Sequence, residues 1–480
     1  MEVKAGFRIE RVLRAAASSW FCAALTLAGP DQQGATRLIA SDSAELARFG
    51  DAVAIDGDIA IIGASGDTQN GVLAGAVYAF SRGMDGSWVE EQKLLPADGA
   101  ANDLFGFSVD LLNDLAIVGA YRDNVNGSGS GSAYVFKRAA NGVWSQEAKL
   151  VPLDGSTQDR FGYSVSIGVG LEGIAACISS YLDDVAGLDS GSAYIFERSI
   201  NGSWSEAAKF QGLDTEELDS FGWAVDIDGD TALVGAYLND EIAPGAGAAY
   251  FFRRDLFGGW TQLQKVTASD AQAVDNFGVD VAIDGSLAVI GAYLDDDNGN
   301  ESGSAYVFRF SGGQWLEEAK LLAPDGQPND EFGRNVSING QRIVIGAELN
   351  SAGGLNSGAA YVYQFLNNQW TFTNKLSAKA PEELAEFGHA VAIDGDDVIV
   401  GAWREDEGPV IDAGAVYLFD TSLIGCQGDL NFDGAVDTAD LGLLLSAFGS
   451  VNIIADINND GVVDTADLGL LLAAFGASCL

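Results

Sequence analysis

The chain has 480 residues, of which 48% are hydrophobic, so it can build a large core and is longer than one ordinary domain. It carries 69 acidic and 25 basic residues, a formal net charge of −44. Nucleic-acid binding needs lysine and arginine to neutralise phosphates, so this balance argues against it, and against anionic membrane surfaces. The charge suits a soluble exported protein, and a merely solubilising acidic surface is the simplest alternative.

The first 28 residues differ from the rest of the chain. Lys4, Arg8, Arg11 and Arg14 precede a stretch of small and apolar residues. That order predicts a secretory signal peptide over residues 1–28. The apolar stretch is too short to span a bilayer stably, and no later stretch is long and apolar enough. We therefore expect a secreted or cell-surface protein without membrane insertion.

A four-part unit recurs seven times between residues 36 and 420. A Phe-Gly pair opens an alternating run, and a Gly-Ala pair ends the second run in every copy but the third, which has Ser179-Ser180. G-x-[AV]-Y marks the third run, and the fourth extends from Trp to Lys plus an apolar residue. Period-two alternation and Asp-Gly turns predict strands and hairpins. Four short strands at a fixed period predict an all-β seven-bladed β-propeller over residues 36–420. The Phe-Gly pairs begin at Phe49, Phe105, Phe161, Phe221, Phe277, Phe332 and Phe387.

The count of strands also predicts how the ring closes. The seventh copy ends at Phe419 without its fourth strand, and one unmatched strand of that kind lies at residues 37–40. Pairing the two would complete seven four-stranded blades. It would also remove the exposed edges that an open array presents.

The Phe-Gly…Gly-Ala pattern resembles the FG-GAP repeats of integrin α-subunit propellers and their bacterial relatives. The resemblance covers residues 36–420 and implies the propeller fold, with recognition and adhesion as the associated role. Integrin-type copies often carry a calcium loop between the first two strands. Here that connection is a tight turn, as at Asp56-Gly57-Asp58, so we expect no calcium in the propeller.

The positions where the repeat varies are the candidates for ligand binding. The residue after Phe-Gly and the residue after Gly-Ala should both face one mouth of the central channel. Aromatic faces with charged neighbours suit a glycan or protein ligand, and the alternative is that the rings simply pack between blades. The candidates are Tyr121, Tyr163, Tyr181, Trp223, Tyr237, Tyr293, Arg334, His389 and Trp403; the same positions also hold Asp51, Ser65, Phe107, Val279 and Glu348.

No catalytic motif stands out from the repeat. His389 is the one histidine, which argues against histidine-ligated metal sites and histidine-based nucleophilic catalysis. We predict no catalytic residues and favour a non-enzymatic recognition protein, expected to be a monomer. The alternatives are a polysaccharide lyase or glycosidase, an accessory protein of an extracellular complex, and a structural surface protein.

After Phe419 a shorter duplication begins, with two twelve-residue loops of calcium-binding type, each followed by a helix at 440–448 or 467–475. Oxygen donors occupy positions 1, 3, 5, 7, 9 and 12, and glycine occupies position 6, where the loop must turn sharply. The pattern predicts two Ca²⁺ ions. The ligands are Asp429, Asn431, Asp433, the Ala435 carbonyl, Asp437 and Asp440 in the first loop, and Asp456, Asn458, Asp460, the Val462 carbonyl, Asp464 and Asp467 in the second.

These loops, with Asp at position 12 and no visible entering helix, resemble type I dockerins. The resemblance predicts a small α-helical, EF-hand-like dockerin-like domain over residues 424–480 and implies a cohesin-like scaffold as partner. A calcium-stabilised tag without such a partner is the alternative. Its small core is expected to use Leu441, Leu443, Leu444, Leu445 and Phe448 with their copies Leu468, Leu470, Leu471, Leu472 and Phe475.

The cysteines agree with an oxidising compartment. Cys426 and Cys479 bracket the C-terminal segment, which predicts a disulfide between them. Cys177 lies in the second strand of the third copy, where other copies carry Ile or Val, and should be buried and inert.

Overall fold

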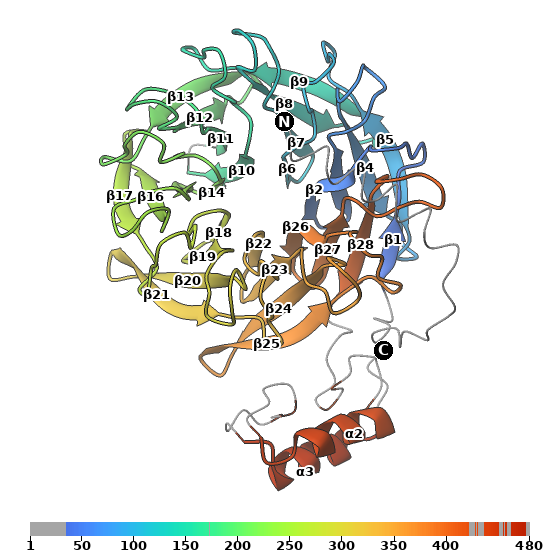
Figure 1. The fold of residues 1–480 in the computed structure, drawn as a ribbon. Coiled ribbons are helices and arrows are strands. Elements are labelled where there is room, and N and C mark those ends of the chain that lie inside the picture. The colour runs from blue at the N-terminus through green and yellow to red at the C-terminus, as the bar shows by residue number, and fades with distance from the viewer. Residues whose placement is uncertain are drawn as a thin grey trace.

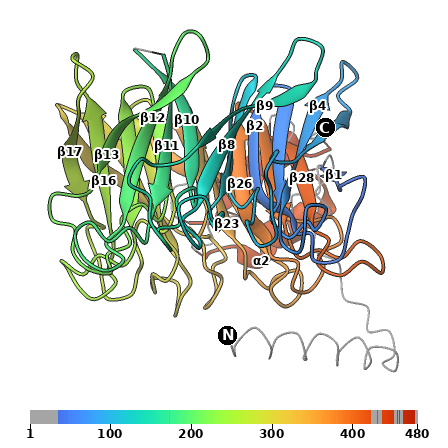
Figure 2. The ribbon, with the colours of Figure 1, turned by 90° about the horizontal axis from the view of Figure 1, so that it is seen from above.

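The computed structural model describes residues 35–171, 173–421, 428, 430, 436–450, 455, 457 and 462–476. Seven four-stranded antiparallel sheets form blades around a common axis (Figure 1). Seen from the side, the strands run between two ends of the ring, where the loops gather (Figure 2). The all-β seven-bladed propeller predicted from the repeats is confirmed.

Each blade has four strands, ordered here from the axis outward. The innermost are β2 (Phe49–Asp56), β6 (Val109–Leu112), β10 (Val165–Gly170), β14 (Val225–Asp228), β18 (Val281–Asp284), β22 (Val336–Asn339) and β26 (Phe387–Asp394). The second strands are β3 (Ile59–Ala64), β7 (Leu115–Ala120), β11 (Gly173–Ser180), β15 (Thr231–Ala236), β19 (Leu287–Ala292), β23 (Arg342–Ala347) and β27 (Asp397–Ala402). The third strands are β4 (Ala76–Arg82), β8 (Ser132–Arg138), β12 (Ser192–Arg198), β16 (Ala248–Arg254), β20 (Ser304–Ser311), β24 (Ala359–Leu366) and β28 (Ala415–Asp420). The outer strands are β5 (Trp88–Leu94), β9 (Trp144–Leu150), β13 (Trp204–Phe210), β17 (Trp260–Val266), β21 (Gln314–Leu321), β25 (Gln369–Leu376) and β1 (Thr36–Leu38).

The N-terminal strand closes the ring, as the strand count predicts. β1 pairs antiparallel with β28, which makes it the outer strand of the seventh blade. Leu38 is buried there. Arg37 bonds Glu405 and Glu407, both at 2.7 Å, at the place where Lys149 bonds two acidic residues in the second blade. The closing strand therefore reproduces both the packing and the charge pairing of a continuous blade.

Two glycines of the repeat bring neighbouring blades into contact. A Cβ atom on Gly63 would lie 2.0 Å from the carbonyl oxygen of Gly106 in the next blade. A Cβ atom on Gly75 would lie 2.0 Å from the carbonyl oxygen of Phe105, and Gly75 also has a φ of +85°. Only glycine fits such approaches. The conserved spacing of the repeat thus follows from how one blade packs on the next.

The Phe-Gly pair precedes the innermost strand in blades 2 to 6 instead of opening it, which corrects the sequence prediction for these copies. Phe105 forms an isolated parallel bridge with Gly75, and β6 begins only at Val109. The Phe105 ring packs edge-on against Tyr134 and Phe136, with centroid distances of 5.5 and 5.9 Å. The phenylalanine therefore anchors the blade in the core. The residue that follows the Phe-Gly pair is not needed for this packing.

Side chains of one innermost strand bond the backbone of the next. The carboxylate of Asp110 accepts the backbone N–H of Ile167 at 2.7 Å, and Asp280 accepts that of Val336 at 2.8 Å. Burial raises the pKa of Asp110 and Asp280 to about 7 in each case. An inner edge otherwise presents unpaired N–H groups, so these bonds join neighbouring blades around the axis.

The Asp-Gly turns serve the same purpose at the other end of the inner strands. Asp228 accepts the backbone N–H of Gly285 at 2.6 Å, and Asp394 accepts that of Gly57 at 2.7 Å. These turn carboxylates connect blades.

The C-terminal segment contains two helices, α2 (Thr438–Ala447) and α3 (Thr465–Ala474). Leu444 and Leu471 are fully buried between them and the flanking Val436 and Val463. The core is small, as predicted, with Leu441 and Leu468 packed against it, but several of the expected apolar residues lie outside it because the helices bury only one narrow side. The exposed members are Leu443, Leu445, Phe448, Leu472 and Phe475. Within the described part of the chain, no helix has the length and apolar character to cross a membrane.

Candidate functional site

The residues after Phe-Gly and after Gly-Ala come together around the axis, at the end where the innermost strands begin. They form two groups, each held together by contacts among its own members. We call them the aromatic group and the charged group. The aromatic group is Phe107, Tyr121, Tyr163, Tyr181, Trp223 and Tyr237. The charged group is Asp51, Tyr293, Arg334, Glu348, His389 and Trp403. Each of the nine candidate residues therefore falls in one of two local networks.

Tyr163 is the centre of the aromatic group. Its ring centroid lies 4.4 Å from Tyr181, 4.7 Å from Trp223 and 5.3 Å from Tyr121. Trp223 in turn lies 4.3 Å from Tyr237. Burial raises the pKa of the Tyr163 phenol well above its ordinary value, so the ring is neutral at physiological pH. The Trp223 ring is only half-buried, so this group offers an aromatic surface that is held rigid by its own contacts.

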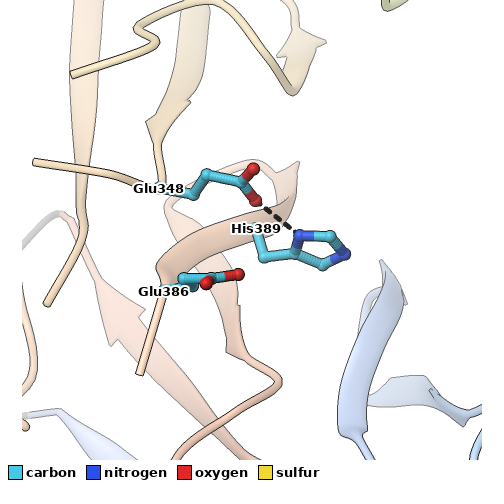
Figure 3. Close-up of side chains that lie close together, drawn as sticks. All are labelled: Glu348, Glu386 and His389. Atoms are coloured by element: carbon cyan, nitrogen blue, oxygen red, sulfur yellow. Dashed lines mark hydrogen bonds and ion pairs between the residues drawn. The ribbon is translucent and has the colours of Figure 1, made fainter. Parts of the chain in front are cut away.

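The charged group is built on Glu348, which is buried (Figure 3). Its carboxylate lies 2.5 Å from His389 Nδ1 and accepts Arg334 Nε at 2.8 Å. His389 Nε2 lies 3.4 Å from Asp51 on the first blade. The Arg334 guanidinium also stands over the ring of Tyr293, 4.7 Å from its centroid.

The protonation of His389 follows from these neighbours. Burial disfavours its charged form, but Glu348 and Asp51 outweigh burial and raise the pKa of His389 to about 10. Burial likewise opposes ionisation of Glu348, but His389 and Arg334 outweigh it and lower the pKa of Glu348. The pair is therefore ionic at neutral pH. A histidine that stays protonated is a poor general base, whose pKa should lie near the working pH.

Glu348, Glu386 and His389 are the one group, among the described residues, whose donor atoms could surround a metal ion, since these atoms lie within 4.8 Å of one another (Figure 3). Both carboxylates already hold cations. Arg334 bonds Glu348, and Arg404 bonds Glu386 at 2.6 Å. Two guanidinium groups so close oppose a second cation, so the arrangement is an ion-pair network.

Sequence reasoning missed the residue that precedes Phe-Gly. Arg48, Arg160, Glu331 and Glu386 occupy this position, and each has a positive φ of 54° to 64°. Arg48 stands over the Trp403 ring at 5.0 Å, and Arg160 lies 5.9 Å from the ring of Tyr121. The positive φ recurs in all seven blades and so belongs to the fold. The sequence could have indicated these residues, because the position before Phe-Gly also varies among the copies and is often charged.

Five of the predicted calcium ligands are described by the structure: Asp437, Asp440, Val462, Asp464 and Asp467. Asp437 and Asp464 begin helices α2 and α3 as their N-caps. Asp440 and Asp467 are fully buried, and Asp440 accepts the backbone N–H groups of Leu430 and Asp437 at 2.7 and 2.8 Å. A set of carboxylate oxygens held at a helix start has the donor chemistry that fits Ca²⁺.

Three sets of predicted residues lie wholly outside the part of the chain that the structure describes. They are the signal peptide 1–28, the pair Cys426 and Cys479, and the ligands Asp429, Asn431, Asp433, Ala435, Asp456, Asn458 and Asp460. Cys177 is described, buried and free, as predicted. Burial also raises the pKa of its thiol, which keeps it unreactive.

Comparison with protein families gives seven matches to the FG-GAP repeat. They cover residues 34–80, 88–136, 144–196, 204–252, 260–308, 315–363 and 370–419. The chain belongs to the FG-GAP repeat family. Each match starts in an outer strand and ends in the third strand of the next blade, so the sequence unit straddles two blades. A comparison with curated proteins found no match. FG-GAP propellers are ligand-binding domains of the adhesion type and are typically extracellular or surface proteins.

Proposed function

We propose that the protein is a secreted, non-enzymatic recognition protein. Its propeller binds an extracellular glycan or protein through the aromatic and charged groups, and its C-terminal module attaches it to an extracellular partner in a calcium-dependent way. The observation that carries the proposal is the meeting of both groups around the axis of one ring.

The two groups offer complementary chemistry to a ligand. The aromatic group presents the half-buried Trp223 and Tyr181, whose rings can stack on a sugar or an aromatic side chain. In the charged group Arg334 and His389 are cationic but partly exposed, with side-chain exposures of 34% and 22%. Hydrogen-bond donors beside rigid rings are a usual composition for a recognition site.

The ion pair of His389 and Glu348 does not favour the enzymatic alternative. A lyase or glycosidase needs a base or an acid with a pKa near the working pH. His389 is held protonated, and Glu348 is held ionised by two cations. These two groups therefore hold fixed charges and do not move protons. Glu331, which lies 3.4 Å from Arg334 and whose pKa burial raises to about 7, is the neighbouring carboxyl that could exchange a proton. The experiment below must distinguish the proposed binding function from a polysaccharide-degrading activity and from a purely structural role.

The test is a glycan and protein array probed with the full chain, run beside assays for reducing sugars and unsaturated products. Trp223→Ala should weaken binding by more than about 1 kcal/mol and leave the melting temperature unchanged. Phe257→Ala is the matched control, because Phe257 is 97% exposed on another part of the propeller. Released product would identify an enzyme. Lower stability with unchanged binding would show that Trp223 only packs.

The C-terminal module is proposed to bind a cohesin-like scaffold. Support comes from the exposed apolar residues of α2 and α3, among them Leu445, Phe448, Leu472 and Phe475. Soluble proteins rarely expose such a group of residues without a partner. The two helices repeat the same exposed positions, so the module offers two related faces.

Calcium should be required for this module to fold. Its buried core is small, and small cores rarely sustain a fold without a staple or a metal. A ligand that binds only the folded state contributes about 2.7 kcal/mol per site at one hundred times its Kd. Residues 424–480 should gain helix on calcium addition, with two ions bound, and Asp440→Ala and Asp467→Ala should each remove one ion. Titration calorimetry beside circular dichroism measures both, and a module equally helical in chelator would contradict the proposal.

A further inference from the structure

The outer strands carry a bulge that presents one side chain to the next blade. In β5 the bulged residue is Glu91, and in β9 it is Glu147. A β-bulge re-aims its side chain, and here both glutamates point at an arginine and a tryptophan of the following blade. Arg138 donates Nε to Glu91 Oε2 at 2.9 Å, and Trp144 donates Nε1 to that same oxygen at 3.3 Å.

The next interface repeats this geometry closely. Arg198 donates Nε to Glu147 Oε1 at 2.7 Å, and Trp204 donates Nε1 to it at 3.0 Å. The second carboxylate oxygen accepts Arg198 Nη2 at 2.6 Å. In both interfaces one oxygen therefore accepts two buried N–H groups, and the other oxygen takes the second nitrogen of the guanidinium.

The interface between blades 3 and 4 keeps the donors and lacks the glutamate. Ala207 occupies the bulge of β13, while Arg254 and Trp260 follow in blade 4. Glu197 accepts Arg254 Nη2 at 2.7 Å and so replaces the second oxygen only. Among the described residues, Arg254 Nε and Trp260 Nε1 are buried without a hydrogen-bond partner. What the protein does not supply here is one oxygen acceptor shared by these two groups.

Two other interfaces show that an unbonded tryptophan alone means little. Trp315 and Trp370 also leave their Nε1 atoms without a partner in the described chain. In those blades Phe310 and Phe365 replace the arginine, and each ring packs against its tryptophan at 5.3 Å. An aromatic ring thus replaces the guanidinium that would share an acceptor with the tryptophan, and Arg253 or Arg309 of the preceding blade lies over that ring at 5.6 and 4.9 Å.

Blade 1 also keeps its arginine without a glutamate from the preceding outer strand, but there Arg82 donates Nε to Asp58 at 2.8 Å. Among the described residues, blade 4 is the one that leaves both the arginine Nε and the tryptophan Nε1 buried and unbonded.

A pocket of about 200 Å³ opens at this place. Its lining residues come from blades 3 and 4, which are neighbours in the ring (Figure 1). Gly170 and Gly173, from the longer inner hairpin of blade 3, form one side of it. Arg254 and Trp260 line it together with Glu197, Asp230, Ser199 and Ser205. The pocket lies at the Asp-Gly-turn end of the inner strands, and the aromatic and charged groups lie at the other end.

The lining specifies the ligand's chemistry. Arg254 and Trp260 provide donors, Glu197 and Asp230 provide acceptors, and the hydroxyls of Ser199 and Ser205 can do either. Arg198 also lines the pocket, but Glu147 balances its charge as Glu197 balances that of Arg254. An incoming anion would therefore meet the carboxylates of Glu197 and Asp230 beside two cations that are already paired. A neutral group that both accepts and donates hydrogen bonds fits best. Sugar hydroxyls have this property, and the pocket has room for one pyranose ring.

We infer that the groove between blades 3 and 4 binds a neutral sugar residue, one hydroxyl oxygen of which accepts the N–H groups of Arg254 and Trp260. This site is separate from the proposed ligand site around the axis. The repeat supplies the most informative variant, because Ala207→Glu restores the side chain that blades 1 and 2 use. The added carboxylate should accept the N–H groups of Arg254 and Trp260 in place of the sugar hydroxyl oxygen. It should therefore block sugar binding and raise the melting temperature.

The experiment titrates the full ¹⁵N-labelled chain with D-glucose, D-galactose and D-mannose, and with D-galacturonate as the anionic counterpart. The readout is the shift of the Trp260 indole N–H signal, assigned by its loss in Trp260→Phe. At least one neutral hexose should bind with a Kd of about 1–10 mM, as expected for one sugar in a shallow site. Ala207→Glu and Arg254→Gln should each weaken binding at least tenfold, and Trp223→Ala should leave it unchanged.

Three results would overturn the inference. The first is saturable binding of galacturonate without any neutral hexose. The second is hexose binding that Ala207→Glu and Arg254→Gln leave intact, provided circular dichroism shows both variants folded. The third is no indole shift with any hexose well above the expected Kd, which would mean that solvent alone satisfies the two donors. Because Trp223→Ala reports on the other site, failure here leaves the proposed ligand site around the axis untouched.

Discussion

Truncating Leu38 tests whether the non-covalent closure of the ring is as strong as a continuous blade. Leu38 is 6% exposed and pairs with Val416 of β28. Leu94 takes the same place in the first blade, where it is 1% exposed and pairs with Val77. Removing a buried leucine side chain costs about 2–5 kcal/mol. Leu38→Ala and Leu94→Ala should therefore lower the free energy of unfolding by similar amounts within that range.

The charge pair of the closing strand adds a second, smaller contribution. Arg37 bonds Glu405, whose side chain is 8% exposed, and removing the arginine leaves that carboxylate without its cation. Breaking a buried pair costs about 3–5 kcal/mol, but Arg37 is 34% exposed and solvent screens part of the loss. We expect about 1–3 kcal/mol for Arg37→Ala. Lys149→Ala, in a continuous blade, is the matched control.

Equilibrium denaturation of the full chain measures how much each substitution lowers the free energy of unfolding. Hydrogen exchange shows which strands are destabilised. Leu38→Ala should speed exchange in β28, and Leu94→Ala should do so in β4. Deleting residues 29–42 should expose the edge of β28 and cause aggregation or a large drop in melting temperature. A deletion variant that stays monomeric with unchanged melting would refute the closure argument, as would a Leu38→Ala variant of wild-type stability beside a destabilised Leu94→Ala.

Two further predictions concern single groups. Peptide mapping without reductant should find Cys426 linked to Cys479 and Cys177 free; closing the loop between them restricts the unfolded chain by about 4 kcal/mol in the chain-entropy model, and any linkage of Cys177 would contradict the pairing. His389 should make stability pH-dependent, because its pKa rises in the folded state from 6.5 to about 10. Its ion pair with Glu348 stabilises fully below pH 6.5 and is lost as the pH rises through 10. The difference in melting temperature between wild type and His389→Gln should shrink from pH 7 to pH 10, and a constant difference would show that the pair does not stabilise the fold.

Much of the propeller could be predicted from sequence because its signals are local and are repeated seven times. Alternation, Asp-Gly turns and the spacing of Phe-Gly pairs each depend on residues a few positions apart. Closure by β1 followed from counting, since one fourth strand stood before the first copy and one was missing after the last. The approximate helix positions in the C-terminal segment followed from the duplicated loop pattern, which placed each helix start at the last loop position, Asp440 or Asp467.

Other features depend on contacts between blades, which no local pattern reports. The innermost strand of blade 2 begins at Val109 because Phe105 bonds across to Gly75 of the preceding blade. His389 could be assigned to the axis from its position, but its pairing with Asp51 required the first blade to stand beside the seventh. The sequence could not show which apolar residues of the small C-terminal core are buried, because that depends on how α2 and α3 contact each other.

The division between fixed and variable positions explains where function can reside in such a ring. A glycine such as Gly63 is kept at its position in six of the seven copies, because a Cβ atom there would strike the next blade; the third copy has Ser179 instead. The residue after Phe-Gly is not needed to anchor the strand, because Phe105 and its equivalents already do so. It can therefore be Trp223 in one copy and Arg334 in another. The bulge of the outer strand is similarly free, which is why Ala207 can replace a glutamate while the ring stays intact. Ligand chemistry in this protein should therefore be sought wherever the seven copies disagree at a position that no neighbouring backbone fills.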